Sequence, residues 1–445
     1  MTTFSRIRAT GLAALLPVAL LAACGEREII LPGQRLDPLA VASPDGPAVI
    51  GAPAPASIAL SLPAMRANAD WTHRAGNAAH DPGHAALGAG MTLQWAASIG
   101  SGDARRFRIT ADPIIWGGMV FTLDSRANVV ATSTGGGTIW QTSLRPATER
   151  GDSVSGGGIS AEGGRIFVTT GYGELVALDA RSGGILWRQR VDTAISGAPA
   201  VQNGVVYVAA RNGVGWAVRA ENGRVLWQTN GIGAPMGVMG VSAPAVSGNT
   251  VVFPFASGQL LAAETADGMT QFSAQVAGTR TGRAIAAIRD MTGDPVIAGG
   301  RLYGGTSSGR ITAFDLGTGA EIWSARDGAN SPVVVAGGSI FAVNDQAELI
   351  RLDAATGGVI WRVALPYYTT ERPRRQDRIF ASYGPVLAGG RLFVASSDGV
   401  LRVFDPASGA LTGQAAIPGG AAAAPAVAGQ TLYVVSRNGQ LLAFR

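Results

Sequence analysis

One pattern of a tight turn followed by an aromatic strand recurs eight times along the chain, and it limits the fold more than any other feature. Each copy has a two-residue turn that contains glycine, followed by a short apolar strand with an aromatic residue. The turns begin at Gly117, Gly163, Asn203, Gly248, Gly299, Gly337, Gly389 and Gly429. Glycine tolerates the positive φ angles of two-residue hairpin turns. The pattern therefore predicts eight antiparallel hairpins, spaced about 38 to 52 residues apart, as in the four-stranded blades of β-propellers.

Two further signals recur at fixed distances within this repeat. An aspartate after an apolar strand is followed four residues later by glycine, as at Asp179, Asp315, Asp353 and Asp405. The aspartate side chain caps a turn and the glycine closes it. A large residue occupies the position four residues beyond the glycine, at Trp140, Trp187, Trp227, Phe272, Trp323 and Trp361. Gly413 stands at that position in the seventh repeat, so we expect the outer strand there to pack least well.

The composition supports a single repetitive all-β domain. A chain of 445 residues is long enough for two or three domains, but its 63 glycines recur in the same turn contexts between short apolar runs. The hydrophobic share of 47% is sufficient for a large core.

The two ends of the repeat region complement each other. Leu93-Gln94-Trp95 looks like an outer strand without a preceding blade, whereas the last repeat, Pro425 to Arg445, stops after its third strand. We therefore predict an eight-bladed β-propeller of four-stranded antiparallel blades over residues 91–445, closed by an N-terminal strand that joins the C-terminal blade. The alternative is a seven-bladed ring with a spare strand at each end, which would leave two unpaired sheet edges.

The N-terminal region is typical of a bacterial lipoprotein. Arg6 and Arg8 precede an apolar stretch that is too short to span a bilayer and that ends at Leu21-Ala22-Ala23-Cys24. This end resembles a lipobox. We predict a signal peptide at 1–23, lipidation at Cys24, a flexible linker rich in proline and alanine at 24–69, and a polar strap at 70–90. An unmodified cysteine after an ordinary signal peptide is the alternative.

The residue after the cysteine bears on the destination of the protein. Gly25 stands where an aspartate would favour retention in the inner membrane, so we expect the outer membrane, with the body facing the periplasm. The lipid would be the only membrane attachment. Because Cys24 is the only cysteine, no intramolecular disulfide can form.

The basic charge does not indicate a nucleic-acid partner. The formal net charge of +5 is spread over loops rather than gathered in one stripe. The local exception is the cluster of Arg372, Arg374, Arg375 and Arg378. We interpret it as an exposed loop between blades; an anionic ligand site is the alternative.

No residue pattern predicts catalysis or metal binding. The repeated aspartates occupy identical turn positions, which marks them as structural. His73, His80 and His84 all precede the ring, and the last two have the spacing of helical metal ligands. Pro82 and Gly83 lie between them, so we expect the strap to pack on the propeller; a metal site is the alternative. No nucleophile elbow, phosphate loop or Cys/His cluster is present.

The repeat resembles a known family. The segments Ala198-Pro199-Ala200-Val201 and Gly173 to Trp187 are similar to the propeller repeat named after pyrroloquinoline quinone, from about Leu93 to the end. Quinoprotein dehydrogenases and the BamB family of outer-membrane lipoproteins share this repeat. A dehydrogenase would need a stacked quinone, a Ca²⁺ site, a catalytic carboxylate and a vicinal disulfide, which one cysteine cannot form. The lipobox, single cysteine and eight repeats resemble the BamB family.

This resemblance implies a non-catalytic scaffold without a cofactor, a monomeric subunit of the complex that assembles outer-membrane β-barrels. The implied partners are a BamA-like barrel assembly protein and nascent barrel strands. The alternatives are a quinoprotein dehydrogenase and a periplasmic propeller that binds polysaccharide or peptide.

Two long connections, Asn230 to Val241 and about 277–294, flank the fourth blade. In the family, contact with BamA is attributed to an apolar-x-apolar-Arg run before Ser-Ala-Pro and to an Asp-x-Asp before the next blade. The resemblance maps these motifs onto Met236, Val238, Met239 and Asp290, with Arg289 as a possible substitute cation. Met239 replaces the family arginine and Thr292 the second aspartate, which favours apolar contact. The alternative is that these loops merely connect blades.

Overall fold

The computed structural model describes residues 58–146, 156–191, 193–195, 197–234, 238, 240, 243–276, 278, 280 and 290–445. The predicted signal peptide, Cys24 and the linker as far as residue 57 lie outside the described residues. Within them, no helix is long and apolar enough to cross a bilayer.

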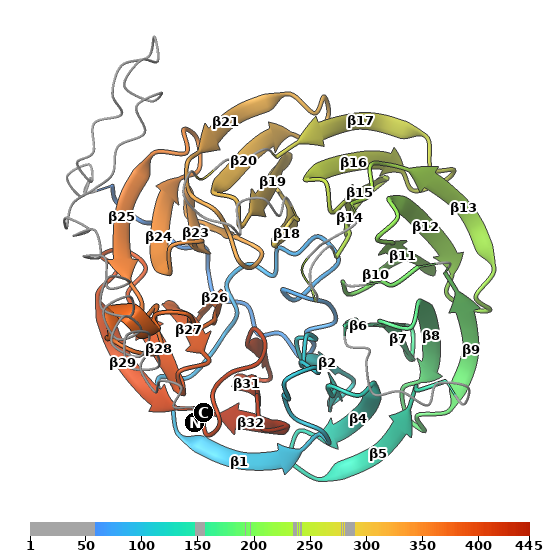
Figure 1. Cartoon of the computed structure of the whole chain (residues 1–445), viewed down its shortest axis with the longest axis horizontal. Coiled ribbons are helices and arrows are strands. Elements are labelled where there is room, and N and C mark those ends of the chain that lie inside the picture. Colours follow the sequence, from blue (N-terminus) through green and yellow to red (C-terminus); the bar gives the residue numbers. More distant parts are fainter. Residues whose placement is uncertain are drawn as a thin grey trace, which may run out of the picture. The chain divides into compact units, whose positions relative to one another are not determined.

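The described residues form eight four-stranded antiparallel sheets around a common axis, with the first strand of most sheets innermost (Figure 1). Blades 1 to 4 contain β2 (Ile114–Trp116), β3 (Met119–Leu123), β4 (Asn128–Ser133) and β5 (Thr138–Ser143); β6 (Ile159–Glu162), β7 (Arg165–Thr170), β8 (Glu174–Asp179) and β9 (Ile185–Arg190); β10 (Ala200–Gln202), β11 (Val205–Ala209), β12 (Val214–Arg219) and β13 (Val225–Asn230); and β14 (Ala245–Ser247), β15 (Thr250–Pro254), β16 (Gln259–Glu264) and β17 (Thr270–Gln275). Blades 5 to 8 contain β18 (Gly293–Ala298), β19 (Arg301–Thr306), β20 (Arg310–Asp315) and β21 (Glu321–Ala325); β22 (Val334–Ala336), β23 (Ser339–Val343), β24 (Glu348–Asp353) and β25 (Val359–Ala364); β26 (Ser382–Ala388), β27 (Arg391–Ser396), β28 (Val400–Phe404) and β29 (Leu411–Ala416); and β30 (Ala426–Ala428), β31 (Thr431–Ser436), β32 (Gln440–Phe444) and β1 (Leu93–Ser98).

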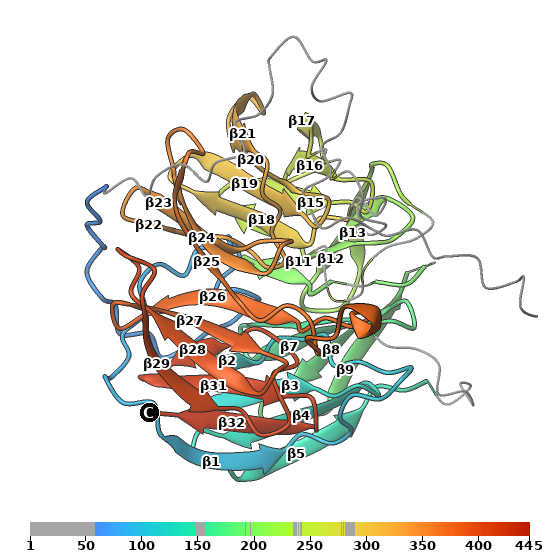
Figure 2. The same cartoon turned by 60° about the vertical axis from the view of Figure 1, so that its left-hand side comes forward.

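The ring is closed, as predicted, by an N-terminal strand that completes the C-terminal blade. Strand β1 pairs antiparallel with β32 and completes the sheet of β30, β31 and β32, with Ala96 opposite Leu442 (Figure 2). Closure satisfies the edge that β32 would otherwise expose. The prediction of eight blades is confirmed, and the seven-bladed alternative is wrong.

The hairpin turns have the predicted backbone geometry. Gly117 and Gly118, between β2 and β3, have φ angles of 58° and 78°, and Asn203 and Gly204 between β10 and β11 have 53° and 76°. Both central residues therefore lie in the left-handed region, which suits glycine and asparagine. The next strand then places its aromatic residue in the core, as Phe121 does.

Where an outer strand carries a tryptophan, as in all blades except blades 4 and 7, that tryptophan connects its blade to the next. The indole of Trp140 in β5 lies 5.8 Å from the ring of Phe121 in its own blade, and its Nε1 donates a hydrogen bond of 3.0 Å to the carbonyl of Ala180 in blade 2. A Cβ on Gly183 would lie 2.5 Å from this indole. The glycine of the repeat is therefore needed for space as well as for its φ of 72°, which the sequence analysis missed.

The repeated aspartates have the predicted structural role. Asp179 accepts hydrogen bonds from the hydroxyl and the amide of Ser182, at 2.7 and 2.8 Å, and these bonds lower the pKa of its carboxyl. Asp315 and Asp405 hold their turns in the same way.

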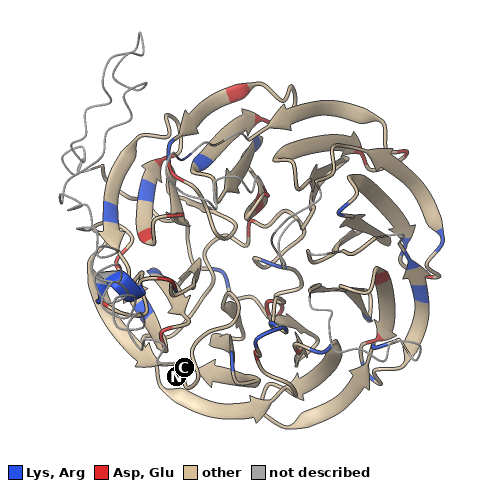
Figure 3. Ribbon diagram, viewed as in Figure 1, with Lys and Arg blue, Asp and Glu red and all other residues tan. Residues whose placement is uncertain are grey.

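The basic cluster lies in the connection between blades 6 and 7. Arg372, Arg374, Arg375 and Arg378 are exposed around a 3₁₀ turn, η2 (Pro373–Arg375). Elsewhere the charged residues are scattered around the ring (Figure 3). The cluster is thus an exposed loop between blades, as expected.

Candidate functional site

Two faces of the ring must be distinguished. The hairpin face carries the turns between first and second strands, and the connection face carries the links from each fourth strand to the next blade. A strap, which in the structure comprises residues 58–92, crosses the middle of the ring over the inner strands (Figure 1). Its contacts with the hairpin turns at Gly337, Gly389 and Gly429 place it toward the hairpin face.

The strap contacts all eight blades. Trp71 pairs with Ile115 of blade 1, and Asn68 accepts a hydrogen bond from Gly429 of blade 8. In blades 2 to 5 and 7, strap groups bond to the backbone of the inner strands: Thr72 with Ala161, His73 with Val201, Ala78 with Val246, Ala79 with Ile297, and Ala85 with Ala388. In blade 6 the contact is with the hairpin turn, where a Cβ on Gly337 would lie 2.8 Å from Leu60 Cδ1. Contact begins before residue 70, so the strap is longer than its predicted range.

The three histidines bind backbone groups of the ring and do not converge. His73 Nε2 lies 3.0 Å from both the amide and the carbonyl of Val201, and His80 Nδ1 donates to the carbonyl of Pro295 at 2.7 Å. His84 donates to Pro63 and accepts from Gly390, both at 2.7 Å. Burial lowers the pKa of His73 to about 4 and that of His80 to about 3. Among the described residues, no three His, Cys, Asp or Glu side chains gather as metal ligands.

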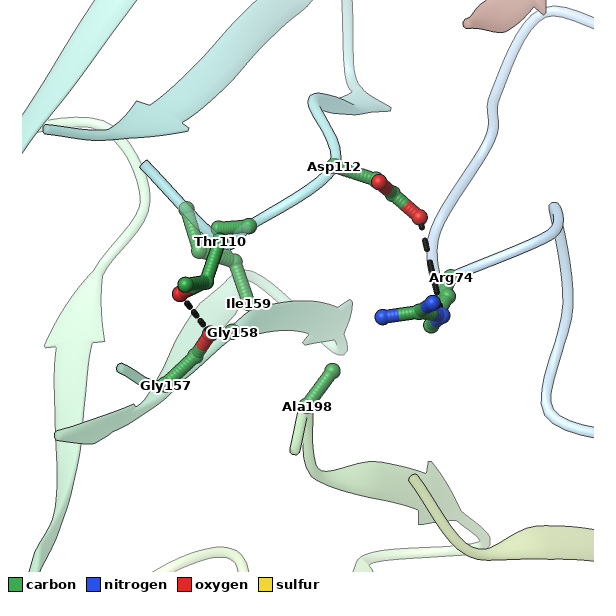
Figure 4. Close-up of a pocket in the computed structure, with 8 residues that line it drawn as sticks. Arg74, Thr110, Asp112, Gly157, Gly158, Ile159 and Ala198 are labelled. Atoms are coloured by element: carbon green, nitrogen blue, oxygen red, sulfur yellow. Dashed lines mark hydrogen bonds and ion pairs between the residues drawn. The ribbon is translucent and has the colours of Figure 1, made fainter. Parts of the chain in front are cut away.

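Arg74 of the strap is buried, and its guanidinium faces the carboxylate of Asp112 (Figure 4) and that of Asp294. Its Nε lies 2.8 Å from Asp294 Oδ2 and 3.7 Å from Asp112 Oδ2, and its Nη1 donates to the carbonyl of Gly240. Burial lowers the pKa of Arg74, but the two carboxylates outweigh it and the net shift is upward. Burial also raises the pKa of Asp112. The site is therefore a paired charge cluster near the ring axis.

A small pocket adjoins this cluster. It contains at most about 200 Å³ of empty space, below the usual range for small-molecule sites. Thr110 on one wall donates a hydrogen bond of 3.0 Å to the carbonyl of Gly157 on the other (Figure 4). The lining residues are small, polar or aliphatic: Arg74, Thr110, Ala111, Asp112, Gly157, Gly158, Ile159 and Ala198.

The two long connections join β13 to β14 and β17 to β18, on either side of blade 4, and the structure brings one candidate partner-binding residue from each of them together. Asp290 Oδ2 accepts a hydrogen bond from the amide of Val238, and Arg211 donates to the carbonyl of Val238 at 3.4 Å. Asp290 is only 1% exposed, and burial raises the pKa of its carboxyl. Its carboxylate therefore holds the neighbouring connection in place. Met236, Met239 and Arg289 lie outside the described residues.

Three residues of this region were not predicted from the sequence. Arg74, Asp112 and Asp294 were not singled out, although Asp112-Pro113 and Asp294-Pro295 are the same dipeptide just before or within the innermost strand of blades 1 and 5. Both carboxylates bridge blades: Asp112 accepts from the amide of Ala424, and Asp294 from that of Ala243. The shared dipeptide was the available signal.

Eight blades of this repeat, closed by the first strand, define a propeller of the class named after pyrroloquinoline quinone. The family model described as outer membrane protein assembly factor BamB matches residues 124–363 and 352–445. The chain therefore belongs to the BamB family.

Individual relatives agree with this assignment. BamB of Yersinia pestis is 26% identical over 361 residues, which cover 79% of this chain and 88% of that protein. BamB of Legionella pneumophila is 26% identical over 210 residues, 47% of this chain and 52% of the relative, so that match spans about half of its length.

Solved structures show the same fold. BamB from Moraxella catarrhalis has a TM-score of 0.66 at 20% identity, covering 80% of this chain and 99% of that one. The quinohemoprotein alcohol dehydrogenase from Comamonas testosteroni also has a TM-score of 0.66, at 16% identity, covering 84% and 80%. At these identities the likeness extends to the fold alone.

The pocket beside Arg74 does not fit the quinone that the dehydrogenase neighbours imply. The pocket has no aromatic ring among its lining residues on which a quinone could stack, and Arg74 is bonded to Gly240 and Asp294 there. The carboxylates that could face a cofactor are already paired with a cation or with backbone amides.

Proposed function

We propose that this protein is a non-catalytic scaffold lipoprotein of the machinery that assembles and inserts outer-membrane β-barrel proteins. The match of the BamB family model over residues 124–445 is the observation that carries the proposal. The paired charges of Arg74, Asp112 and Asp294, beside a pocket without an aromatic ring in its lining, favour a binding role over quinone chemistry. In this proposal the protein is a monomeric subunit of a hetero-complex, without cofactor, metal or nucleic acid.

The proposed docking surface for a BamA-like barrel assembly protein is the connection face around blade 4. Met236, Val238, Met239, Arg289 and Asp290 are the residues that the family resemblance assigns to it. Ile232, in the connection between β13 and β14, is 58% exposed. A large exposed aliphatic side chain in the same connection as Val238 is the kind of apolar anchor that a protein interface buries.

Nascent barrel strands are the second proposed partner. Ile139, Leu186, Leu226 and Ile322 each directly precede the tryptophan of an outer strand, and all are exposed. An extended segment with alternating apolar residues could pair with such an edge strand by β-augmentation while it covers these side chains.

The proposed location is the outer membrane, with a lipid on Cys24 as the only attachment and the propeller in the periplasm. The lipobox-like sequence and Gly25 support this location. Residues between Cys24 and the strap would serve as the tether.

Co-purification tests the proposal most simply. A tagged full-length protein is extracted from its native membranes in mild detergent, and associated proteins are identified by mass spectrometry. A large outer-membrane barrel protein in near-stoichiometric amount is expected. Its consistent absence would contradict the proposal, as would stoichiometric binding of pyrroloquinoline quinone in an absorbance titration.

A further inference from the structure

Arg74 connects the two faces of the ring. Its backbone belongs to the strap, where neighbouring residues bond to inner strands of blades 2 and 3. Its guanidinium reaches Asp294 and the carbonyl of Gly240, and Gly240 lies in the connection between β13 and β14. A strap residue therefore touches the connection that carries the proposed docking residues.

Three buried side chains hold this connection by its backbone. Asp290 accepts from the amide of Val238, Arg74 donates to the carbonyl of Gly240, and Asp294 accepts from the amide of Ala243 at 3.1 Å. Asp294 is itself paired with Arg74. Arg74 thus fixes Gly240 directly and Ala243 through Asp294.

The chemistry of this cluster requires arginine. The side chain of Asp294 is fully buried and that of Asp112 is 7% exposed, so both carboxylates depend on a nearby cation. A planar guanidinium presents donors in several fixed directions and can bond a carboxylate and a carbonyl at once. The compact ammonium group of a lysine could neutralise Asp294 but not reproduce both bonds.

The backbone at Gly240 is also specific to this arrangement. Its φ is 79°, and a Cβ there would lie 2.8 Å from Cβ of Thr110, in the connection that leads to blade 1. Gly240, whose carbonyl Arg74 binds, is therefore packed closely against the connection that leads to blade 1.

We propose that Arg74 is a positioning residue for the docking surface, through which the strap holds the backbone at Gly240 and Ala243 in place. The proposal rests on the proposed function only in naming the connection between β13 and β14 a docking surface. Docking of the strap and binding of the partner are then coupled. A partner that contacts this connection binds more tightly when the strap is docked on the ring, and partner binding in turn stabilises the docked strap.

The control for Arg74 is Arg391, which anchors the other end of the strap. Arg391 donates to the carbonyl of Ala89 at 2.9 Å and to that of Gly88, on the hairpin face. Among the described residues, Arg391 makes no hydrogen bond or ion pair with Val238, Gly240 or Ala243. Replacing it loosens the strap without removing a contact to Val238, Gly240 or Ala243.

The experiment compares full-length wild type with Arg74→Met, Arg74→Lys and Arg391→Met by amide hydrogen exchange of the peptide that spans residues 238–243. We expect both Arg74 variants to exchange at least about tenfold faster there, while Arg391→Met leaves this peptide unchanged. Arg74→Lys retains a cation for Asp294, so this variant can still be measured if Arg74→Met does not fold. Unchanged exchange in Arg74→Lys, or equal acceleration in Arg391→Met, would overturn the proposal.

Affinity for the barrel assembly partner is measured on the same variants. The proposal predicts about a tenfold loss for Arg74→Lys and none for Arg391→Met. If wild type binds no such partner, the proposed function fails while the exchange data still decide whether Arg74 positions the segment.

Discussion

The ring of Trp95 lies 6.0 Å from that of Tyr433, centroid to centroid, and its indole nitrogen donates a hydrogen bond of 3.1 Å to the carbonyl of Thr134. Trp95 comes from the first strand, Tyr433 from the last blade and Thr134 from blade 1. One side chain therefore joins the two ends of the chain and connects blade 8 to blade 1, as the other tryptophans connect their blades.

Trp95→Ala should weaken this closure. We expect a loss of about 2 to 4 kcal/mol in the free energy of unfolding, because an indole contact and a hydrogen bond are both removed. Chemical denaturation followed by circular dichroism measures it. Leu93→Ala, on the same strand but 39% exposed, is the control and should change stability by less than about 0.5 kcal/mol. Equal effects of the two substitutions would contradict the role of Trp95.

The repeat glycines should separate into two classes. Gly163 and Gly183 have φ angles of 57° and 72°, but a Cβ meets nothing within 4 Å at Gly163 and lies 2.5 Å from Trp140 at Gly183. Gly163→Ala should cost about 1 kcal/mol from backbone strain alone. Gly183→Ala should cost about 3 kcal/mol or more, since the indole must move. Similar losses in thermal or chemical unfolding would show that space at Gly183 does not matter.

Acid should destabilise the strap through its buried histidines. The pKa of His73 is about 4 and that of His80 about 3 in the folded protein, below the ordinary value of 6.5. The stabilisation that the two neutral histidines provide is therefore fully present above about pH 6.5. It is lost as the pH falls toward 4, which lowers the free energy of unfolding by on the order of 3 kcal/mol for each histidine. The free energy of unfolding, measured from pH 7.5 to 4.5, should fall. His73→Gln with His80→Gln should flatten the curve, and an unchanged slope would refute this origin.

Lipidation of Cys24 has a direct readout. Intact mass spectrometry of protein extracted from membranes should show a mature chain that begins at Cys24 and carries acyl groups. Cys24→Ala should abolish acylation and release the protein from the membrane fraction. A mature chain with a bare N-terminal cysteine would contradict the prediction.

The fold was predictable from local sequence patterns because the residues of each pattern lie within one blade. The paired glycines, the capping aspartates and the tryptophans lie a few residues apart, and their physical roles follow from turn geometry and burial. The need for space at Gly183 was not predictable, since it depends on Trp140 of the neighbouring blade. Ring closure was predictable because each chain end lacked what the other supplied.

The site was predictable only in part. Family resemblance singled out Val238 and Asp290, which the structure brings together, but nothing local showed that the Asp290 carboxylate is buried. Arg74 was missed because an isolated arginine in a strap has no pattern, and its partners Asp112 and Asp294 are distant in sequence. Such contacts depend on how the strap crosses the ring.

The central claim is that the connection face around blade 4 binds the barrel assembly partner. Ile232 lies on that face and is 58% exposed. The control is Met269, an apolar residue that is 68% exposed in the turn between β16 and β17, on the opposite face of blade 4. The decisive measurement is the amount of partner that co-purifies with Ile232→Asp and with Met269→Asp. The account predicts at least about a tenfold loss for Ile232→Asp, because a charge would be buried in an apolar contact, and wild-type recovery for Met269→Asp. Full recovery of the partner by Ile232→Asp, or an equal loss with both variants, would contradict it.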